Sequence, residues 1–282
     1  MKVGIIGYTG FVGGYLATRV SGDLYNSSNI HDIIGKHYDI VYCCGLPAAK
    51  WIANREPEVD YTNMMNLMDT LSKATIGTFI LISTIDVYDK SVPAQDEDGN
   101  AYARECSYGR HRRLMELWAL DAYKDCYIFR LPALFGIGLK KNVIYDLLTE
   151  NPYCKFNTED TYQWYYLDDL YNDILDSIMQ NRRIVNLFTE PIPMKTLIQY
   201  VFPDFAREDA VESVSAVAYN YVTKYGGYVQ DTSYIIKRMQ EFVRLWKCLE
   251  THRDQLVISN LAWREEDLAL AVICLLYTSP SP

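Results

Sequence analysis

The chain has 282 residues and 49% of them are hydrophobic, so it is long and apolar enough for a large globular domain. Its formal net charge of −9 argues against a nucleic-acid partner or an anionic membrane surface. Seven cysteines without metal-ligand spacing indicate reduced thiols, and we expect no metal site. A strand is expected from the first residues, and they show no signal-peptide pattern. No apolar run reaches membrane-spanning length. These two observations predict a cytoplasmic protein with no membrane partner.

The first thirteen residues carry the clearest motif. Residues 3–6 are an apolar run that predicts a short buried strand. Gly7, Gly10 and Gly13 follow at intervals of three, and the residues after them have helical spacing. A strand, a glycine turn and a helix in this order are typical of the first unit of a dinucleotide-binding domain. There the backbone of the turn approaches the pyrophosphate, and the helix N-terminus stabilises the negative charge of this group. The alternative is an ordinary strand-to-helix turn.

Beyond this turn, strands and helices are expected to alternate. The sequence predicts strands at residues 23–26, 39–45, 78–84 and 125–131, and helices at residues 29–36, 60–74 and 107–122, the last capped by Ser107. This alternation predicts an α/β fold with a Rossmann-like, doubly wound parallel sheet, whose ligands lie outside the carboxyl ends of the strands. The short distance from Gly7 to Asp39 indicates that one strand and one helix of a full six-strand arrangement are missing.

The last part of the chain is interpreted as three segments. Residues 234–249 are amphipathic and predict a helix that closes the first domain. Residues 255–276 resemble the first strand and helix of a sugar-phosphate isomerase/epimerase barrel, and one such unit cannot bury its own apolar face. Residues 274–282 resemble translated adapter sequence, so we expect an artefactual tail there. The alternative for this region is a native helical tail packed on the first domain.

Several separated pieces of the chain resemble one family, the extended short-chain dehydrogenases/reductases that act on nucleotide sugars. These pieces are the glycine turn, Asn63, and residues 83–88, 108–116, 130–136, 166–169, 184–191 and 223–227. The resemblance covers roughly residues 1–245 and is greatest to the dTDP-4-dehydrorhamnose reductase branch of these NAD-dependent epimerases/dehydratases. It implies an NAD(P)-binding domain at residues 1–250, with a small C-terminal substrate-binding subdomain formed mainly by residues 136–165 and 190–250.

The resemblance also implies a catalytic set. It makes Tyr108 the general acid or base and Thr84 the residue that orients the substrate. Relatives place a lysine four residues after the tyrosine, to lower its pKa and hold the nicotinamide ribose, but this chain has Arg112. The charge remains, although arginine and lysine are not interchangeable. Asp86 is either an additional acid or a turn residue, and the alternatives for Tyr108 and Arg112 are a buried aromatic and a solvated basic turn.

For the cofactor, the resemblance implies NAD or NADP. The residues expected to bind it are Gly7, Thr9, Gly10, Phe11, Val12, Gly13, Asn26, Cys44, Gly45, Leu46, Asn63, Tyr108, Arg112 and Leu131. The turn at Asn26 offers neither the acid typical of NAD sites nor the basic group typical of NADP sites, and NADP is slightly favoured because no acid repels its extra phosphate. Lys140, Lys141 and Asn142 are the candidates for binding the substrate, with an exposed helix start as the alternative.

Two hypotheses of function follow. The first is an NAD(P)-dependent enzyme acting on a nucleotide-linked sugar as its small-molecule partner, most specifically a 4-keto reductase, with C-4 epimerisation as the neighbouring reaction. The second is a non-catalytic dinucleotide-binding sensor or scaffold that retains the fold. Arg112 favours the second hypothesis, whereas Thr84 together with Tyr108 favours the first. The chain is compatible with a homodimer, and the fold alone does not decide between the two hypotheses.

Overall fold

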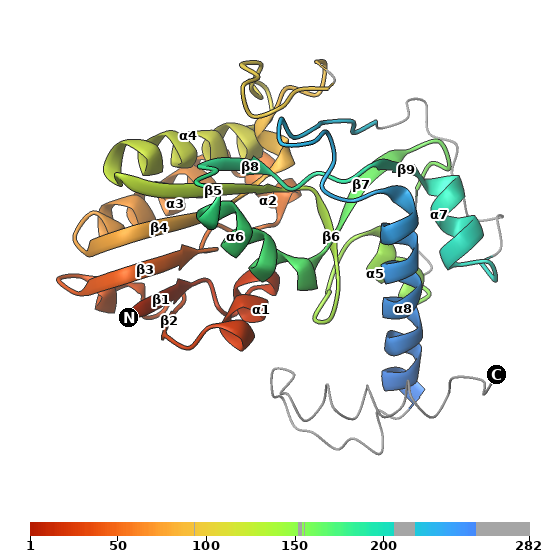
Figure 1. Ribbon diagram of the computed structural model, residues 1–282, viewed down its shortest axis with the longest axis horizontal. Coiled ribbons are helices and arrows are strands. Elements are labelled where there is room, and N and C mark those ends of the chain that lie inside the picture. The colour runs from red at the N-terminus through yellow and green to blue at the C-terminus, as the bar shows by residue number, and fades with distance from the viewer. Residues whose placement is uncertain (93, 152–153, 155, 206–217, 252–282) are drawn as a thin grey trace.

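The protein is organised around one six-stranded sheet with the order β2-β1-β3-β4-β5-β8 (Figure 1). The computed structural model describes residues 1–251 apart from residues 93, 152–153, 155 and 206–217, so the segments expected at 255–276 and 274–282 lie outside the described residues. The strands are β1 (Val3–Ile6), β2 (Asp23–Tyr25), β3 (His37–Cys43), β4 (Thr75–Thr84), β5 (Asp125–Leu131) and β8 (Ile184–Asn186). All their pairings are parallel, which confirms the predicted Rossmann-like sheet.

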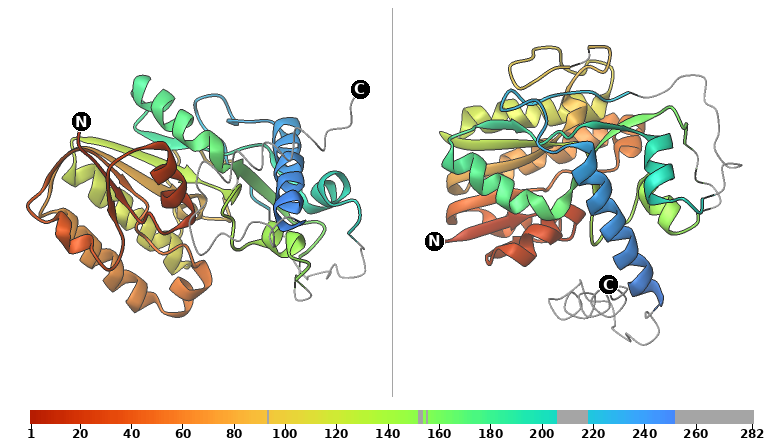
Figure 2. Two further views of the ribbon diagram at one scale, coloured as in Figure 1. Left: turned by 90° about the horizontal axis from the view of Figure 1, so that it is seen from below. Right: turned by 45° about the vertical axis from the view of Figure 1, so that its right-hand side comes forward.

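Helices cover both faces of this sheet (Figure 2). They are α1 (Phe11–Arg19), α2 (Lys50–Arg55), α3 (Pro57–Leu71), α4 (Ser107–Ala122) and α6 (Leu170–Met179). Strand β3 shows how the sequence builds the two layers. Val41 and Cys43 pack in the core beneath α3 and α4, while Tyr42 between them packs in the core beneath α1 and α6. This alternation follows from the two-residue period of a strand, and burial on both faces explains its nearly continuous apolar run.

The predicted elements agree with the structure except in two places. The strand expected at 125–131 and the helix expected at 107–122 coincide with β5 and α4. The helix expected at 29–36 is wrong, because only a 3-10 turn forms, at Ile30–Ile33. Only this turn and β2 separate α1 from β3, as the short distance from Gly7 to Asp39 predicts, but the sheet still has six strands because β8 completes it, so the expectation of a six-strand arrangement lacking one strand is wrong. Ser107 is also not the cap of α4, since Cys106 occupies the cap position and Ser107 is the first helical residue.

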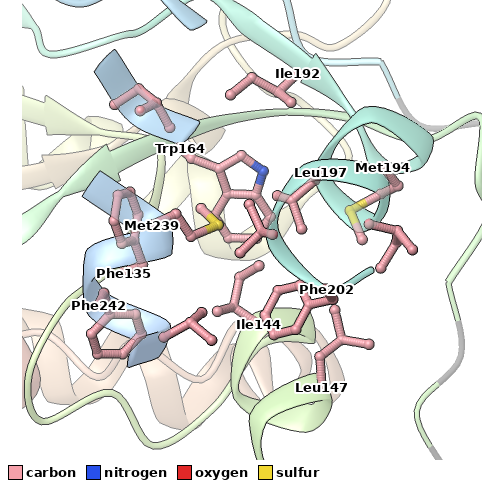
Figure 3. Packing of buried hydrophobic residues seen from close by; sticks show 14 of the residues in the cluster. Phe135, Ile144, Leu147, Trp164, Ile192, Met194, Leu197, Phe202, Met239 and Phe242 are labelled. Carbon is pink, nitrogen blue, oxygen red and sulfur yellow. The ribbon is translucent and has the colours of Figure 1, made fainter. Parts of the chain in front are cut away.

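The C-terminal part of the described chain forms a second, smaller layer. A three-stranded sheet with the order β6-β7-β9 packs with helices from later in the chain. The elements are β6 (Ala133–Phe135), α5 (Val143–Leu148), β7 (Thr161–Tyr166), β9 (Pro191–Pro193), α7 (Met194–Val201) and α8 (Thr232–Thr251). Figure 3 shows Trp164 at the centre of their core, facing Met239 of α8 and Leu197 of α7. The amphipathic stripe predicted for residues 234–249 is therefore buried here as α8.

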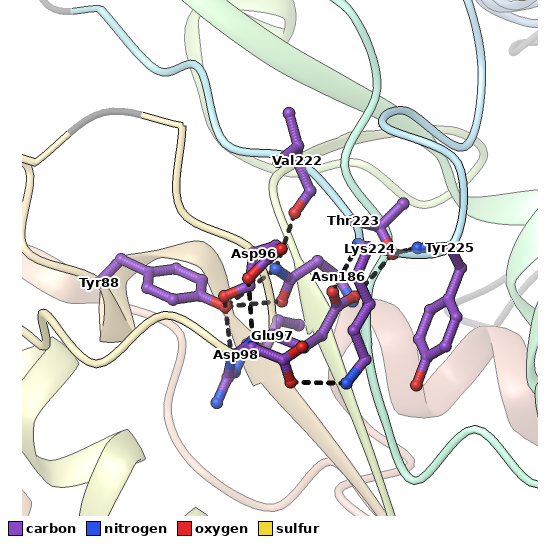
Figure 4. Close-up of polar contacts among 10 residues, drawn as sticks. Tyr88, Asp96, Glu97, Asp98, Asn186, Val222, Thr223, Lys224 and Tyr225 are labelled. Atoms are coloured by element: carbon purple, nitrogen blue, oxygen red, sulfur yellow. Dashed lines mark hydrogen bonds and ion pairs between the residues drawn. The ribbon is translucent and has the colours of Figure 1, made fainter.

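A buried glutamate joins the two parts of the molecule next to the site. Glu97 lies in the connection between the 3-10 turn η2 (Ile85–Val87) and α4. Its carboxylate accepts hydrogen bonds from the backbone amide of Asn186 at 2.6 Å, the Thr223 hydroxyl at 2.7 Å and the backbone amide of Lys224 at 2.8 Å (Figure 4). A charged acceptor that takes three donors is strongly held. Glu97 therefore fixes the segment around residue 223 against this connection.

Candidate active site

The glycine turn between β1 and α1 is built by close backbone contacts. Gly7 has a φ of +83°, and a Cβ added there would lie 2.4 Å from the Cys44 carbonyl oxygen. A Cβ added to Gly13 would lie 2.2 Å from the Gly7 carbonyl oxygen. Both positions therefore require glycine. Among the described residues, no side chain caps the first amides of α1 and no acidic residue lies in its first turn. These amides are oriented to bind an anion such as a pyrophosphate.

The other residues expected at the cofactor site gather at the same edge of the sheet. Parallel strands place their carboxyl ends together, and these residues follow β1, β2 and β3 or end β5. They are Thr9, Gly10, Phe11, Val12, Asn26, Cys44, Gly45, Leu46 and Leu131. Asn63 lies on the exposed surface of α3, where it lines a small pocket with Pro47 and Asp60. The residues present thus fit a dinucleotide, although the individual contacts stay predictions.

The turn after β2 is built from neutral groups. The Asn26 side-chain oxygen accepts hydrogen bonds from the amide of Ser28 at 2.8 Å and its hydroxyl at 2.6 Å. The backbone amide of Asn26 in turn donates to the side-chain oxygen of Asn29 at 2.7 Å. Since an acid here typically selects NAD and a basic group selects NADP, this turn has no charge of its own with which to choose. The slight preference for NADP stays a prediction.

The structure brings Thr84 and Tyr108 together, as the sequence predicts. Thr84 is the last residue of β4, and its hydroxyl accepts the Asp86 amide at 3.2 Å. The Thr84 side chain also interacts with the phenol of Tyr108 and lowers its pKa. Gly109 makes this approach feasible, because a Cβ there would lie only 1.8 Å from the Asp86 carbonyl oxygen. The absence of a side chain at Gly109 lets the first turn of α4 pack directly on the end of β4.

The Tyr108 phenol is not as acidic as the sequence suggested. Burial raises its pKa above 10.0, and this effect outweighs the lowering by the Arg112 charge. Asp86 raises the pKa as well, while Lys50 and the Thr84 side chain lower it. The expected net lowering is therefore wrong, because spacing along a helix reveals the cation but not the burial of the ring. At neutral pH the phenol is protonated and able to donate.

Arg112 lies beside Tyr108 but is held by other groups. Its guanidinium carbon is 4.0 Å from the centre of the Tyr108 ring, in a cation–π contact. Nη1 donates to the Asp60 carboxylate at 2.5 Å, and Nη2 donates to the Pro47 carbonyl at 2.6 Å. The His111 ring lies 2.7 Å from the same Asp60 oxygen. Arg112 is thus part of a buried charge cluster that joins α4 to α3 and to the loop after β3.

A second group of charges acts on Tyr108, and sequence reasoning identified only Asp86 in it. The Asp86 Oδ1 atom forms an ion pair with Lys50 of α2. Lys90 Nζ lies 3.7 Å from the same oxygen, and the Tyr219 hydroxyl donates to it at 3.4 Å. Lys50 and Tyr219 lie 36 and 133 positions from Asp86 in sequence, so no local spacing reveals them. Lys90 is only four positions after Asp86, but this spacing was not considered.

The three residues expected to bind the substrate occupy the loop after β6. The Asn142 side chain caps α5, since its oxygen accepts the amides of Ile144 and Tyr145 and its nitrogen donates to the Leu134 carbonyl. Lys141 donates to the Ala48 carbonyl at 2.8 Å, and Lys140 is exposed. Asn142 therefore has a structural role at the helix start. Substrate binding by these three residues stays a prediction.

The comparison with family models decides where the chain belongs. Residues 16–183 match the model of the NAD dependent epimerase/dehydratase family, and this match spans more than half of the chain. The protein is a member of that family. The match begins within α1, after the glycine turn, and includes β4, Thr84, Tyr108 and Arg112. None of the curated proteins compared with the chain matches it.

Solved structures share the fold of this epimerase/dehydratase family member at low sequence identity. MoeE5 in complex with UDP-glucose and NAD has a TM-score of 0.67 and 15% identity, covering 89% of this chain and 100% of that one. The dTDP-4-dehydrorhamnose reductase from Yersinia enterocolitica has a TM-score of 0.64 and 12% identity, covering 86% and 98%. L-threonine 3-dehydrogenase from Trypanosoma brucei has a TM-score of 0.68 and 15% identity, covering 89% and 98%. At these identities the comparisons establish the fold.

Two further observations concern the described part of this family member. Within those residues, no three His, Cys, Asp or Glu side chains gather as a metal site. None of the helices that the structure describes is long and apolar enough to cross a membrane.

Proposed function

We propose that the protein is an NAD(P)-dependent oxidoreductase or epimerase that acts on a nucleotide-linked sugar, most specifically a 4-keto reductase. The observation that carries the proposal is that Thr84 and Tyr108 interact where the first turn of α4 packs on the end of β4 at Gly109. This pair lies at the carboxyl edge of the sheet, where the glycine turn also lies. Membership of the epimerase/dehydratase family supports the reaction class. The structural similarity to MoeE5 in complex with UDP-glucose and NAD supports the substrate class.

The chemistry assigned to the chain's own residues is proton transfer and orientation. A bound nicotinamide supplies or accepts the hydride, and the amides at the start of α1 with Gly7 and Gly13 hold its pyrophosphate. Tyr108 then donates a proton to the substrate carbonyl oxygen while Thr84 orients that oxygen by a hydrogen bond. The raised pKa of Tyr108, caused by its burial, keeps the phenol protonated at neutral pH. This protonation state suits reduction of a ketone better than oxidation of an alcohol.

The second candidate function is a dinucleotide-binding sensor or scaffold without catalysis. The observation that favours it is Arg112, which replaces the expected lysine and whose Nη1 and Nη2 atoms are engaged by Asp60 and Pro47. Such an arginine is poorly placed to hold a nicotinamide ribose in the way a lysine would. Turnover of nucleotide sugars separates the two functions. Product analysis must accompany the nicotinamide absorbance, because an epimerase returns its hydride.

Replacing Tyr108 with phenylalanine tests the proposed chemistry. Tyr108→Phe keeps the ring and removes the proton donor, so turnover should fall by about a hundredfold or more with cofactor affinity little changed. Turnover of dTDP- and UDP-sugars with NADH and NADPH is the measurement, and Tyr200→Phe on the exposed face of α7 is the matched control. An unaltered rate in Tyr108→Phe would place the chemistry elsewhere, with Asp86 as the next candidate.

Cofactor binding at the glycine turn has its own test. A side chain at Gly10 would point into open space apart from the Gly7 carbonyl oxygen, 3.2 Å from the added Cβ, so the chain can fold around it. In Gly10→Val the branched side chain should obstruct the pyrophosphate and weaken NADH and NADPH binding by about tenfold or more. Gly10→Ala should give a smaller loss. Titration calorimetry measures both, and a folded Gly10→Val variant with parental affinity would show that the dinucleotide binds elsewhere.

A further inference from the structure

Tyr108 interacts with two clusters of charge. In the first, Arg112 is buried, with 4% of its surface exposed, and its Nη1 and Nη2 atoms are engaged by Asp60 and Pro47. Its cation contacts the face of the Tyr108 ring. A phenolate carries its charge mainly on the oxygen, so a cation over the ring face with engaged donors stabilises it incompletely. The second cluster contains another cation, Lys50 of α2.

Helix α2 brings Lys50 to Tyr108. Asn54 lies one turn after Lys50 on the same helix, so both side chains share a face. The Asn54 side-chain oxygen accepts the backbone amide of Tyr108 at 3.0 Å, which docks this face of α2 on the first turn of α4. Lys50 itself forms an ion pair with Asp86, two residues after Thr84. The side chain of Lys50 is about a third exposed, at 34%, so its ammonium retains room to move.

We propose that Lys50 is a positioning residue for proton transfer by Tyr108, with its ammonium able to move from the Asp86 carboxylate toward the phenol oxygen. Lys50 thereby adds a second cation, from α2, to that of Arg112, which occupies the position of the relatives' lysine. This inference rests on the proposed function, because it presumes that Tyr108 transfers a proton. It differs from the family resemblance in adding a cation from α2 to the one at position 112.

The two members of the Lys50–Asp86 pair act on Tyr108 with opposite signs. The charge of Lys50 lowers the pKa of Tyr108, and the charge of Asp86 raises it. A displacement of Lys50 from Asp86 toward the phenol therefore strengthens the cation's effect. Among the described residues, Lys90 and Tyr219 contact the same Asp86 oxygen, Cys106 interacts electrostatically with both lysines, and Asp86 acts on Tyr221. The other charge cluster consists of Arg112 with Asp60 and His111.

The test follows the titration of Tyr108 directly. A ring-fluorinated tyrosine incorporated at position 108 alone gives one fluorine NMR signal, and the fluorine brings the phenol pKa into an accessible range. Lys50→Met should move the midpoint of this titration to higher pH, because it removes a cation near the phenolate. Asp86→Asn should move it to lower pH. Lys50→Arg retains the charge and should stay near the parent.

Lys90→Met is the matched control, since Lys90 contacts the same Asp86 oxygen and stacks on Tyr219, with Nζ 4.6 Å from the ring centre. Its midpoint should stay near the parent. An unchanged midpoint in Lys50→Met, or an equal shift in Lys90→Met, overturns the proposal. If Lys50→Met does not fold, Asp86→Asn and Lys50→Arg still test the proposal. A titration midpoint of Tyr108 that is unchanged or higher in Asp86→Asn contradicts the proposal.

Turnover separates this inference from the function on which it rests. We expect Lys50→Met to oxidise the alcohol about tenfold more slowly than the parent at pH values below the midpoint of the Tyr108 titration. Lys50→Arg should restore most of this rate. A large loss in Tyr108→Phe with full activity in Lys50→Met would leave the proposed function intact and overturn the role of Lys50. Full activity in Tyr108→Phe would instead remove the proton transfer by Tyr108 on which both the proposed mechanism and this inference rest.

Discussion

Glu116→Gln is expected to lower the free energy of unfolding by about 3–5 kcal/mol, because it leaves a buried arginine without its counter-charge. Glu116 and Arg130 are both fully buried, at 0% exposure. Arg130 donates to both carboxylate oxygens, from Nε at 2.9 Å and from Nη2 at 2.7 Å. Ser83 and Arg113 donate to the same carboxylate at 2.6 and 2.8 Å. A neutral amide cannot accept from all these donors, so the guanidinium becomes an unpaired buried charge.

Urea unfolding followed by circular dichroism measures this loss. Glu241→Gln in α8 is the control, since its partner Arg238 is 39% exposed and an exposed pair contributes less than about 1 kcal/mol. A Glu116→Gln variant within the range of this control would contradict the prediction. The Glu116 network also lies beneath the site, because Ser83 precedes Thr84 at the end of β4. Its loss should therefore reduce turnover as well as stability.

The same pair gives the stability of the parent a defined pH dependence. Burial alone would raise the pKa of Glu116, but the Arg130 charge and the hydrogen bonds from Arg130, Ser83 and Arg113 lower it overall. A carboxyl group whose pKa is lower in the folded state stabilises the protein above its unfolded pKa, about 4.3. That contribution is lost as the pH falls through the lowered value. The difference in stability between the parent and Glu116→Gln should therefore shrink in acid.

Much of the fold could be predicted from the sequence because its signals are local. A strand between two covered faces must be apolar, so β5 is recognisable from residues 125–131 alone. The glycine turn is equally local, because Gly7 and Gly13 meet each other within seven residues. The helix expected at 29–36 failed for a related reason. Only Ile33 of the 3-10 turn is buried, and a single apolar contact does not sustain several helical turns.

From spacing alone, the candidate site was predictable only where one element supplies both partners, and the pairing of Thr84 with Tyr108 followed instead from the family resemblance. Tyr108 and Arg112 share a helix face, and their spacing correctly placed the cation beside the ring. The partners of that cation come from residues 47 and 60, which no spacing along α4 can reveal. The amide of Tyr108 is likewise satisfied by Asn54 across 54 positions, a partner that no local spacing reveals. Burial, which sets the direction of the Tyr108 pKa shift, is a property of the assembled fold.

Arg112→Met is expected to combine a loss of stability with a loss of function. Asp60 is 7% exposed and would keep only His111 beside its carboxylate, so unfolding should become easier by about 3 kcal/mol or more. The loop after β3 would also lose the hydrogen bond from Arg112 to the Pro47 carbonyl. Since this loop carries Gly45 and Leu46, which are expected at the cofactor, NADH and NADPH should bind more weakly. Thermal unfolding and calorimetric titration measure the two effects separately.

Two companion variants identify the cause. Asp60→Asn combined with Arg112→Met removes the uncompensated charge and should recover part of the lost stability, because a buried carboxylate costs more than a buried amide. Arg112→Lys keeps the charge but cannot reach both Asp60 and Pro47 as a planar fork does, so it should be less stable than the parent.

The pH–rate profile of Arg112→Met should also change. Arg112 is the charge that lowers the pKa of Tyr108 most, so in this variant the limb of the profile that reports Tyr108 should move to higher pH. If Arg112→Met has the stability, cofactor affinity and pH–rate profile of the parent, Arg112 neither stabilises the contact of α4 with α3 nor acts as the electrostatic partner of Tyr108.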